Sequence, residues 1–305
     1  MEVFRKDKPT NKVRVLFIVA CITFPIINWL IFYIFANFQS FGMAFTNRHG
    51  ELSLDNFARF VGEFSDPDST LPIAFKNTFI TFGIILVSFP FKVLVSYFIY
   101  KKIPGYKFYK IVFFVPMVLF SLALDLVVAR LLSVDGFIAQ AVQEWLHLDA
   151  TPELLGDSRY ANIVIWLHMI WMGFPGDLII WGGTFARIPE EVLESAKVDG
   201  VNWWQEFTKI IVPLVWPTVT LQMVLMLCGI FSASGAVFTL TRGEYGTMTL
   251  SNWIFMQTLY ISNNYSNSNA FNYVSAVGLI LSTVAIIISL TVRRFADKHF
   301  SEVEY

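Results

Sequence analysis

Long apolar runs separated by short polar segments are the main pattern of this chain. Six runs reach the roughly 20 residues that a helix needs to cross a hydrocarbon layer about 30 Å thick. Apolar side chains occupy every face of these runs, whereas membrane-spanning β-strands are about ten residues long and alternate in polarity. The pattern therefore predicts an all-α integral membrane protein with six transmembrane helices. Their predicted ranges are 15–36, 75–100, 108–132, 161–185, 214–240 and 271–292.

Composition supports this prediction. Charged residues make up 15% of the 305 residues, against about 25% in soluble domains, and hydrophobic residues make up 55%. This balance excludes a soluble enzyme, a disordered protein and a nucleic-acid-binding protein. Cys21 and Cys228 both lie inside apolar runs, so a disulfide framework is not expected.

The basic residues predict the orientation in the membrane. Fifteen of the 22 Lys and Arg residues lie in the two tails and in the connections after the second and fourth runs, counting Lys110 at the start of the third run, and four lie in the other connections. Because cytoplasmic segments are enriched in Lys and Arg, both termini are predicted to be cytoplasmic. The first run is too long for the apolar part of a signal peptide and no Ala-x-Ala site follows it, so we interpret it as a retained anchor. The chain then divides into a tail (1–14), a six-helix domain (15–292) and a second tail (293–305).

The cytoplasmic connection after the fourth run predicts two short helices around a glycine. Pro189 suits a first helical turn, and Gly200 suits a left-handed helix end. Asn202 followed by Gln205 forms a capping-box pattern, and Pro213 is expected to open the fifth span. Taken alone, this pattern fits an amphipathic hairpin at the membrane surface as well as it fits a docking element for a partner protein.

The same connection, 187–213, resembles the Glu-Ala-Ala loop of ABC importer permeases. The family spacing is Glu-Ala-Ala, three residues, Gly, nine residues, Ile-x-Leu-Pro, and this chain departs from it mildly with Ser195 and Val212. In that family the loop is the coupling helix, which inserts into a cleft of the ATPase subunit. The resemblance implies a coupling role for Glu194, Ser195, Ala196, Asp199, Gly200, Ile210 and Pro213.

Further stretches are similar to maltose-type sugar permeases. These are Leu54-Asp-Asn-Phe57, Asn77-Thr78, Phe113-Phe-Val-Pro116, Asp135-Gly136 and Thr241-x-Gly243. The resemblance implies a type I permease bundle in the bacterial cytoplasmic membrane. It also implies four partners: a second, homologous permease subunit, a pair of cytoplasmic ATPase subunits, an extracytoplasmic solute-binding protein and a carbohydrate substrate. The chain has no P-loop pattern and no Cys/His metal spacing, so we expect no enzyme activity, metal or cofactor of its own, and ATP and Mg²⁺ bound by the ATPase subunits.

A sugar site inside the bundle needs a few polar groups and aromatic surface. The resemblance carries contact positions over to Met117, Ser121, Met169, Met172, Gly173, Gly176, Ser232 and Ala233. From the residues themselves, the hydroxyls of Ser121, Ser232 and Ser234 suit hydrogen bonds to a sugar, and Trp171 suits stacking on its ring. The alternative is that the small residues merely let the helices approach closely.

Charged residues within predicted spans raise further alternatives. We expect Lys92 to reach partly toward the cytoplasm, and Pro175-Gly176 to break the fourth span before Asp177. For Lys92, Asp125, Arg130 and Asp177, ion pairs or caps within the bundle are favoured over substrate contacts, and His168 is interpreted as a core residue. The favoured function is a permease subunit of an ABC carbohydrate importer. The alternatives are a permease for a solute such as glycerol phosphate, a cation-coupled transporter using Asp125 or Asp177, and a non-transporting scaffold.

Overall fold

The computed structural model describes residues 11–232, 235–264 and 268–299. Within these ranges the secondary structure is helical, apart from an isolated bridge between Thr46 and Leu52. The chain forms two compact units, each described separately below. The first comprises Met1–Val61 and Tyr260–Ile280, and the second comprises Gly62–Leu259 and Leu281–Tyr305.

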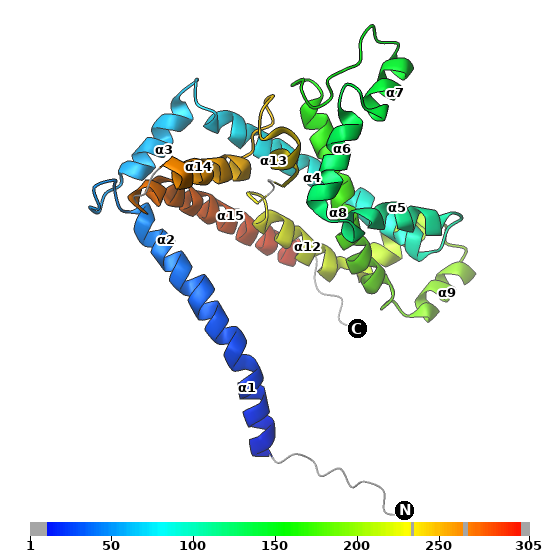
Figure 1. Cartoon of the computed structure of the whole chain (residues 1–305). Coiled ribbons are helices and arrows are strands. Elements are labelled where there is room, and N and C mark those ends of the chain that lie inside the picture. Colours follow the sequence, from blue (N-terminus) through cyan, green and yellow to red (C-terminus); the bar gives the residue numbers. More distant parts are fainter. Residues whose placement is uncertain (1–10, 233–234, 265–267, 300–305) are drawn as a thin grey trace, which may run out of the picture. The chain divides into compact units, whose positions relative to one another are not determined.

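The first unit contains the N-terminal helical rod (Figure 1, blue). It consists of α1 (Asn11–Trp29), a π-helical stretch (Leu30–Phe35) and α2 (Ala36–Ala44). The sequence predicted its end at residue 36, but the helix runs on for eight residues because the polar residues there fit a helix. The Asn37 side chain, for example, donates to the Tyr33 carbonyl one turn back, at 2.6 Å.

Two asparagines fix the turn between α2 and α3 (Asp55–Ser65). Asn56 Nδ2 donates to the carbonyls of Ala44 and Thr46 at 3.1 and 2.8 Å. Asn272 Nδ2 donates to the Thr46 carbonyl at 2.9 Å from the start of α15 (Asn272–His299). These side chains satisfy carbonyls that the turn leaves without backbone partners.

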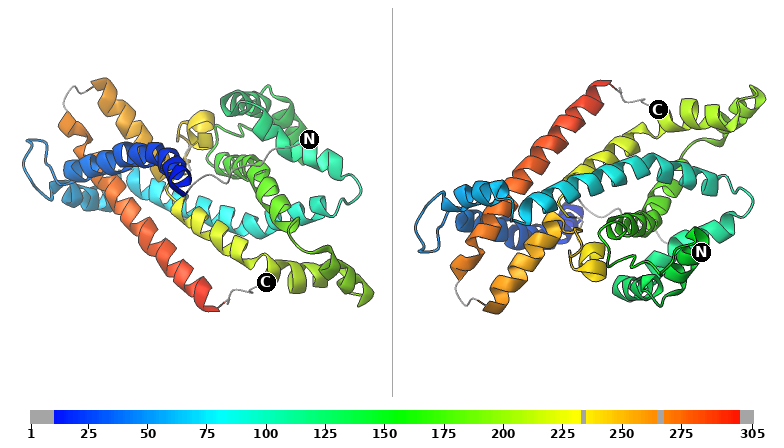
Figure 2. Two further views of the ribbon diagram at one scale, coloured as in Figure 1. Left: turned by 90° about the horizontal axis from the view of Figure 1, so that it is seen from below. Right: turned by 90° about the horizontal axis from the view of Figure 1, so that it is seen from above.

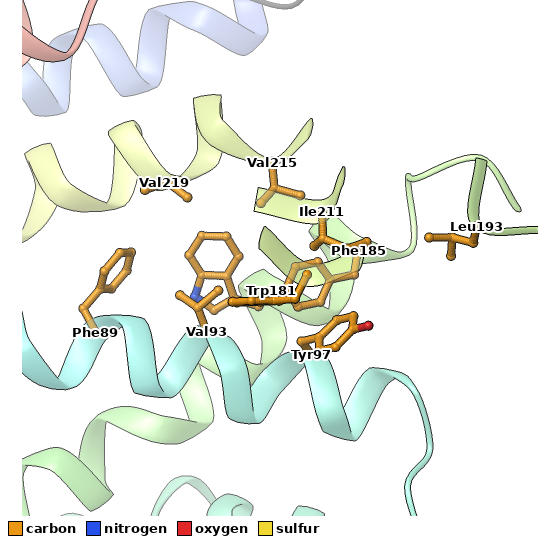
Figure 3. Close-up of a cluster of buried hydrophobic side chains, with 10 residues drawn as sticks. Phe89, Val93, Tyr97, Trp181, Phe185, Leu193, Ile211, Val215 and Val219 are labelled. Atoms are coloured by element: carbon orange, nitrogen blue, oxygen red, sulfur yellow. The ribbon is translucent and has the colours of Figure 1, made fainter. Parts of the chain in front are cut away.

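The core of the second unit is the contact between α4 (Leu71–Tyr100) and α8 (Ala161–Phe185), which Figure 2 shows from two opposite sides. The ranges agree with the second and fourth predicted spans. Phe89, Val93 and Tyr97 of α4 meet Trp181 and Phe185 of α8 in a buried apolar cluster (Figure 3).

The predicted break at Pro175-Gly176 is wrong, because α8 is continuous through both residues. Pro175 lacks the N–H that would bond the Trp171 carbonyl, which removes a single backbone hydrogen bond. Phe174 and Leu178, on either side of the proline, are buried. Side-chain packing therefore holds the helix together across this position.

The third predicted span is not one helix. It is divided into α5 (Tyr106–Val118) and α6 (Ser121–Leu132), followed by α7 (Phe137–Leu146). The axes before and after Leu119-Phe120 differ by 113°. Both of these residues have extended backbone, just beyond Pro116. The expectation of a continuous helix over 108–132 is therefore wrong.

The fifth predicted span is also divided. α10 (Trp203–Gln205), a π-helical stretch (Glu206–Ile211) and α11 (Val212–Leu214) lead into α12 (Trp216–Cys228), with a 73° bend at Val215. α12 ends at Cys228, just before Gly229, and α13 (Gly235–Thr241) follows. Pro213 thus lies before the bend and does not itself open the long helix.

The polar region after α13 contains a helix that the sequence did not predict, α14 (Leu250–Asn264). A short 3-10 turn (Ser268–Phe271) then leads into α15. Among the described residues, four helices are long and apolar enough to cross a membrane, and six are if each bent pair counts as one span. The predicted all-helical fold rich in apolar helices is confirmed, while the number of six spans and the orientation stay predictions.

Candidate functional site

The predicted helix–glycine–helix element is present. α9 (Glu190–Val198) begins after Pro189 with Glu190 and Glu191 in its first turn, where carboxylates favour the positive helix end. It ends at Gly200, whose φ is +70°. The Val201 N–H then donates to the Ala196 carbonyl at 3.1 Å. Gly200 therefore has the left-handed conformation that the sequence predicted.

The predicted capping box is present as well. The Gln205 N–H donates to Asn202 Oδ1 at 2.9 Å, and the Asn202 N–H donates to Gln205 Oε1 at 3.2 Å. These reciprocal bonds fix the start of α10 directly after the glycine turn. The loop thus has a defined conformation of its own.

The element is attached to the bundle by apolar contacts and one ion pair. Leu193 of α9 and Ile211 belong to the buried cluster of α4 and α8 (Figure 3). Lys101 Nζ lies 2.7 Å from Glu206 Oε1, which joins the end of α4 to the π-helical stretch. The element is therefore packed against both α4 and α8.

The predicted coupling residues divide into two groups. Glu194, Ser195, Asp199, Gly200 and Pro213 are exposed, whereas Ala196 is buried and Ile210 is half-buried. The buried face attaches the element, and the exposed face is available to a partner.

Sequence reasoning missed one side chain on that exposed face. Val198 is 87% exposed, the most of any large apolar residue on α9. An apolar residue beside Asp199-Gly200, at the end of an otherwise polar helix, is the signal that could have identified it.

The candidate pathway residues lie near the breaks and on α8. Met117 and Ser121 flank the α5–α6 bend and are exposed, as are Gly176 of α8 and Ser232 after α12. Met169, Trp171 and Met172 of α8 are half-buried. Ala233 and Ser234 lie outside the described residues.

Trp171 has a role beside α5 that the sequence did not suggest. Its indole N–H donates to the Val112 carbonyl of α5 at 3.2 Å. Val112 lies four residues before Pro116, so the proline leaves this carbonyl without its helical partner. Trp171 supplies the missing donor from α8.

Lys92 lies inside the bundle in an ion pair, in agreement with the interpretation favoured for it from the sequence. Its Nζ is 3.0 Å from Asp177 Oδ2, and the residue is 7% exposed. Gly173 makes room for the ammonium group, since a Cβ there would lie 2.5 Å from Nζ. A buried cation needs such a partner, which explains why the lysine turns inward.

Asp125 and His168 form a second buried polar contact. Asp125 Oδ1 lies 2.8 Å from His168 Nε2, and the Thr239 hydroxyl donates to Asp125 Oδ2 at 2.7 Å. The contact joins α6, α8 and α13, in agreement with the interpretation of His168 as a core residue. Within the described part of the chain, no group of three or more His, Cys, Asp or Glu side chains is arranged to hold a metal ion.

A cavity of about 740 Å³ lies at the end of the second unit predicted to face outside. The segment between α7 and α8 lines it together with Tyr245 and Gly246. In that segment the Arg159 guanidinium, hydrogen-bonded to Asp157, lowers the pKa of the Asp157 carboxyl.

The turn beside this cavity is firmly held. Arg242 and Tyr245 have φ values of 56° and 54°, and Gly243 and Gly246 also have positive φ. Asn77 Nδ2 donates to the Gly246 and Met248 carbonyls at 2.6 and 2.9 Å. The polar rim of the cavity is therefore preorganised.

Comparison with known proteins agrees with the resemblance seen in the loop. No family model matches the chain. It is 26% identical over 280 residues to the multiple sugar-binding transport system permease protein MsmF of Streptococcus mutans, covering 90% of this chain and 93% of that protein. It is 22% identical to the arabinooligosaccharides transport system permease protein AraP of Bacillus subtilis, covering 87% of this chain and 83% of that one.

A solved structure shows the same fold. A chain of a bacterial alginate ABC transporter, in complex with an alginate pentasaccharide-bound periplasmic protein, superposes with a TM-score of 0.78 at 21% identity. The match covers 97% of this chain and 99% of the other. The resemblance to ABC transporter permeases is thus confirmed along nearly the whole chain.

Proposed function

We propose that this chain is a membrane-spanning permease subunit of an ATP-driven ABC importer that carries carbohydrate, chiefly oligosaccharide, into the cytoplasm. The observation that supports this proposal most directly is the structure of the 187–213 element. Its buried face packs against α4 and α8, and its exposed face contains Glu194, Ser195, Asp199 and Gly200. Relatives over most of the chain, named as permeases of sugar transport systems, support this proposal.

The two helix breaks support a substrate path. Transporters commonly bind substrate where spanning helices are discontinuous, because unwound backbone and helix ends supply polar groups inside an apolar bundle. Ser121 begins α6 directly after the extended Leu119-Phe120, and Ser232 follows the end of α12. Met117 adds exposed surface beside the first break, and Gly176 adds exposed surface on α8. We assign these residues to the path, with Trp171 bonded to α5 before the bend.

The assembled transporter has four further components in this proposal. A second, homologous permease completes the bundle, and a pair of ATPase subunits binds ATP and Mg²⁺ and contacts α9. An extracytoplasmic binding protein delivers the sugar to the end where the 740 Å³ cavity lies. ATP supplies the free energy for alternating access, so the bundle needs only two packings of similar stability. The complex resides in the bacterial cytoplasmic membrane with both termini of this chain inside.

The alternatives have less support. A cation-coupled transporter would use Asp125 or Asp177, but these carboxylates already contact His168 and Lys92. A solute phosphate site inside the bundle would need an available cation deep in a span, and Lys92 is held by Asp177.

The coupling role is tested with Glu194→Lys, matched by Glu144→Lys on α7, an identical charge change at another exposed site. Glu194→Lys is expected to lower labelled-oligosaccharide uptake at least tenfold and to reduce co-purification of the ATPase, at unchanged membrane levels. Glu144→Lys should leave both measurements at the wild-type value. Unchanged uptake in Glu194→Lys would refute the coupling assignment.

A further inference from the structure

A second cavity lies where α4 ends, α5 begins and α8 passes beside them. Its volume is about 380 Å³. The side chains of Ile99, Phe114, Leu178 and Ile179 form an apolar wall. Gly182 and Gly183 of α8 carry no side chain and leave the groove open along that helix.

The remaining lining is basic and hydroxyl-bearing. Lys102 and Lys110 contribute two ammonium groups, and Tyr100 and Tyr106 contribute phenol hydroxyls. The lining contains no Asp or Glu. The cavity thus combines an apolar wall with a rim that attracts anions, which matches an amphiphile with a negative head.

The backbone at Lys102 points to a role for its side chain. Its φ is +56°, a left-handed conformation that normally selects glycine. The Lys102 N–H donates to the Ile99 carbonyl at 3.1 Å, so the residue closes the end of α4. Keeping a lysine in a conformation that disfavours side chains indicates that the ammonium group is useful there.

The position of the cavity along the chain is also informative. Lys102 and Lys110 belong to the connection predicted to be cytoplasmic, directly after the apolar length of α4. A basic pocket between spans at that depth meets the headgroups of the inner leaflet. Lysine stems can follow the apolar wall while the ammonium groups stay among the headgroups.

We propose that this cavity binds an anionic phospholipid. Lys102 and Lys110 contact the headgroup phosphate, Tyr100 and Tyr106 donate hydrogen bonds to it, and an acyl chain follows the wall toward Phe114 and Ile179. The bound lipid would occupy the groove between the ends of α4, α5 and α8. This assignment is independent of which solute the transporter carries.

The test uses the assembled transporter, purified in mild detergent and mixed with phosphatidylglycerol or phosphatidylcholine. Native mass spectrometry counts retained lipids for Lys102→Gly, for Lys110→Ala and for the double variant. Lys107→Ala is the matched control, since Lys107 is exposed in the same segment but does not line the cavity. Each cavity lysine is expected to contribute about fivefold in phosphatidylglycerol affinity. Thermal stability should not fall for Lys102→Gly, because glycine suits the backbone there.

Several outcomes would overturn the proposal. Equal retention of phosphatidylcholine would show an apolar crevice without headgroup selection. A loss in Lys107→Ala as large as in the cavity variants would show only general surface charge. Competition by glycerophosphoglycerol, which lacks acyl chains, at the same concentration as the lipid would show a site for soluble anions.

Discussion

Two glycines three residues apart on α8 have opposite surroundings. A Cβ at Gly173 would collide with the Lys92 ammonium, whereas a Cβ at Gly176 would have no neighbour within 4 Å. A side chain at Gly173 would therefore displace the Lys92 ammonium from its place beside Asp177. A Cβ at Gly176 has no such effect, and the open space beside it is what the proposed substrate path needs.

Substituting Gly176 by Leu separates these two roles. A Cβ at this position meets no neighbour of this chain within 4 Å, and leucine favours a helix over glycine by about 1 kcal/mol, so membrane levels should not fall. We expect uptake to drop at least tenfold because the added side chain enters the path. Gly83→Leu on α4, where a Cβ also has open space, is the control and should transport normally. Normal uptake in Gly176→Leu would remove this residue from the path.

The conformation of a residue could be predicted from sequence where neighbouring residues in the chain determine it. The left-handed Gly200 and the Asn202–Gln205 capping box follow from residues a few positions apart, and both predictions are confirmed. An ion pair of Lys92 within the bundle was expected, but the identity of its partner was not predictable, because Asp177 belongs to another helix. Sequence shows that a charge lies in a span but not which distant group neutralises it.

At the scale of elements, a proline inside a helix has different effects on the continuity of that helix in α5 and in α8. Pro175 leaves α8 continuous, whereas the helix containing Pro116 ends at Val118 and the next one turns by 113°. Each proline leaves one carbonyl without a helical donor. At Pro116 the donor is replaced from another helix by Trp171, and the outcome is thus set by tertiary contacts.

A double-mutant cycle tests this replacement. Trp171→Phe leaves the Val112 carbonyl unpaired, so it should lower the free energy of unfolding of the purified transporter by about 1–3 kcal/mol. In a Pro116→Ala background the restored backbone N–H can bond Val112, and the same substitution should cost less. The measurement is denaturant unfolding of all four variants. Equal costs in both backgrounds would show that Trp171 acts through packing alone.

At the scale of the whole molecule, the apolar runs predicted the spans well where the helices are continuous. The ranges of α4 and α8 agree with prediction to within a few residues. The runs at 108–132 and 214–240 are equally apolar but bent, because hydropathy records composition and not axis direction. The short α14 was missed for a related reason, since its mixed composition lacks a spanning signal.

The predicted orientation is tested by labelling single cysteines from one side of the membrane. After Cys21 and Cys228 are replaced, Glu194→Cys should react with a membrane-impermeant maleimide only in permeabilised cells. Trp145→Cys, at a residue 81% exposed on α7, should react in intact cells. The reverse pattern would place the coupling element outside and overturn the function proposed for it.

The bond between Trp171 and Val112 also has a consequence for how the protein is made. The two residues are 59 positions apart, so the Val112 carbonyl is synthesised about 3–12 s before its donor. During this interval an unpaired carbonyl in hydrocarbon would cost several kcal/mol. The nascent α5 is therefore expected to remain beside the insertion channel, where water can satisfy this carbonyl, and to enter the lipid together with α8. During biogenesis, α5 and α8 would then be released from the insertion channel into the lipid as a pair and not one at a time.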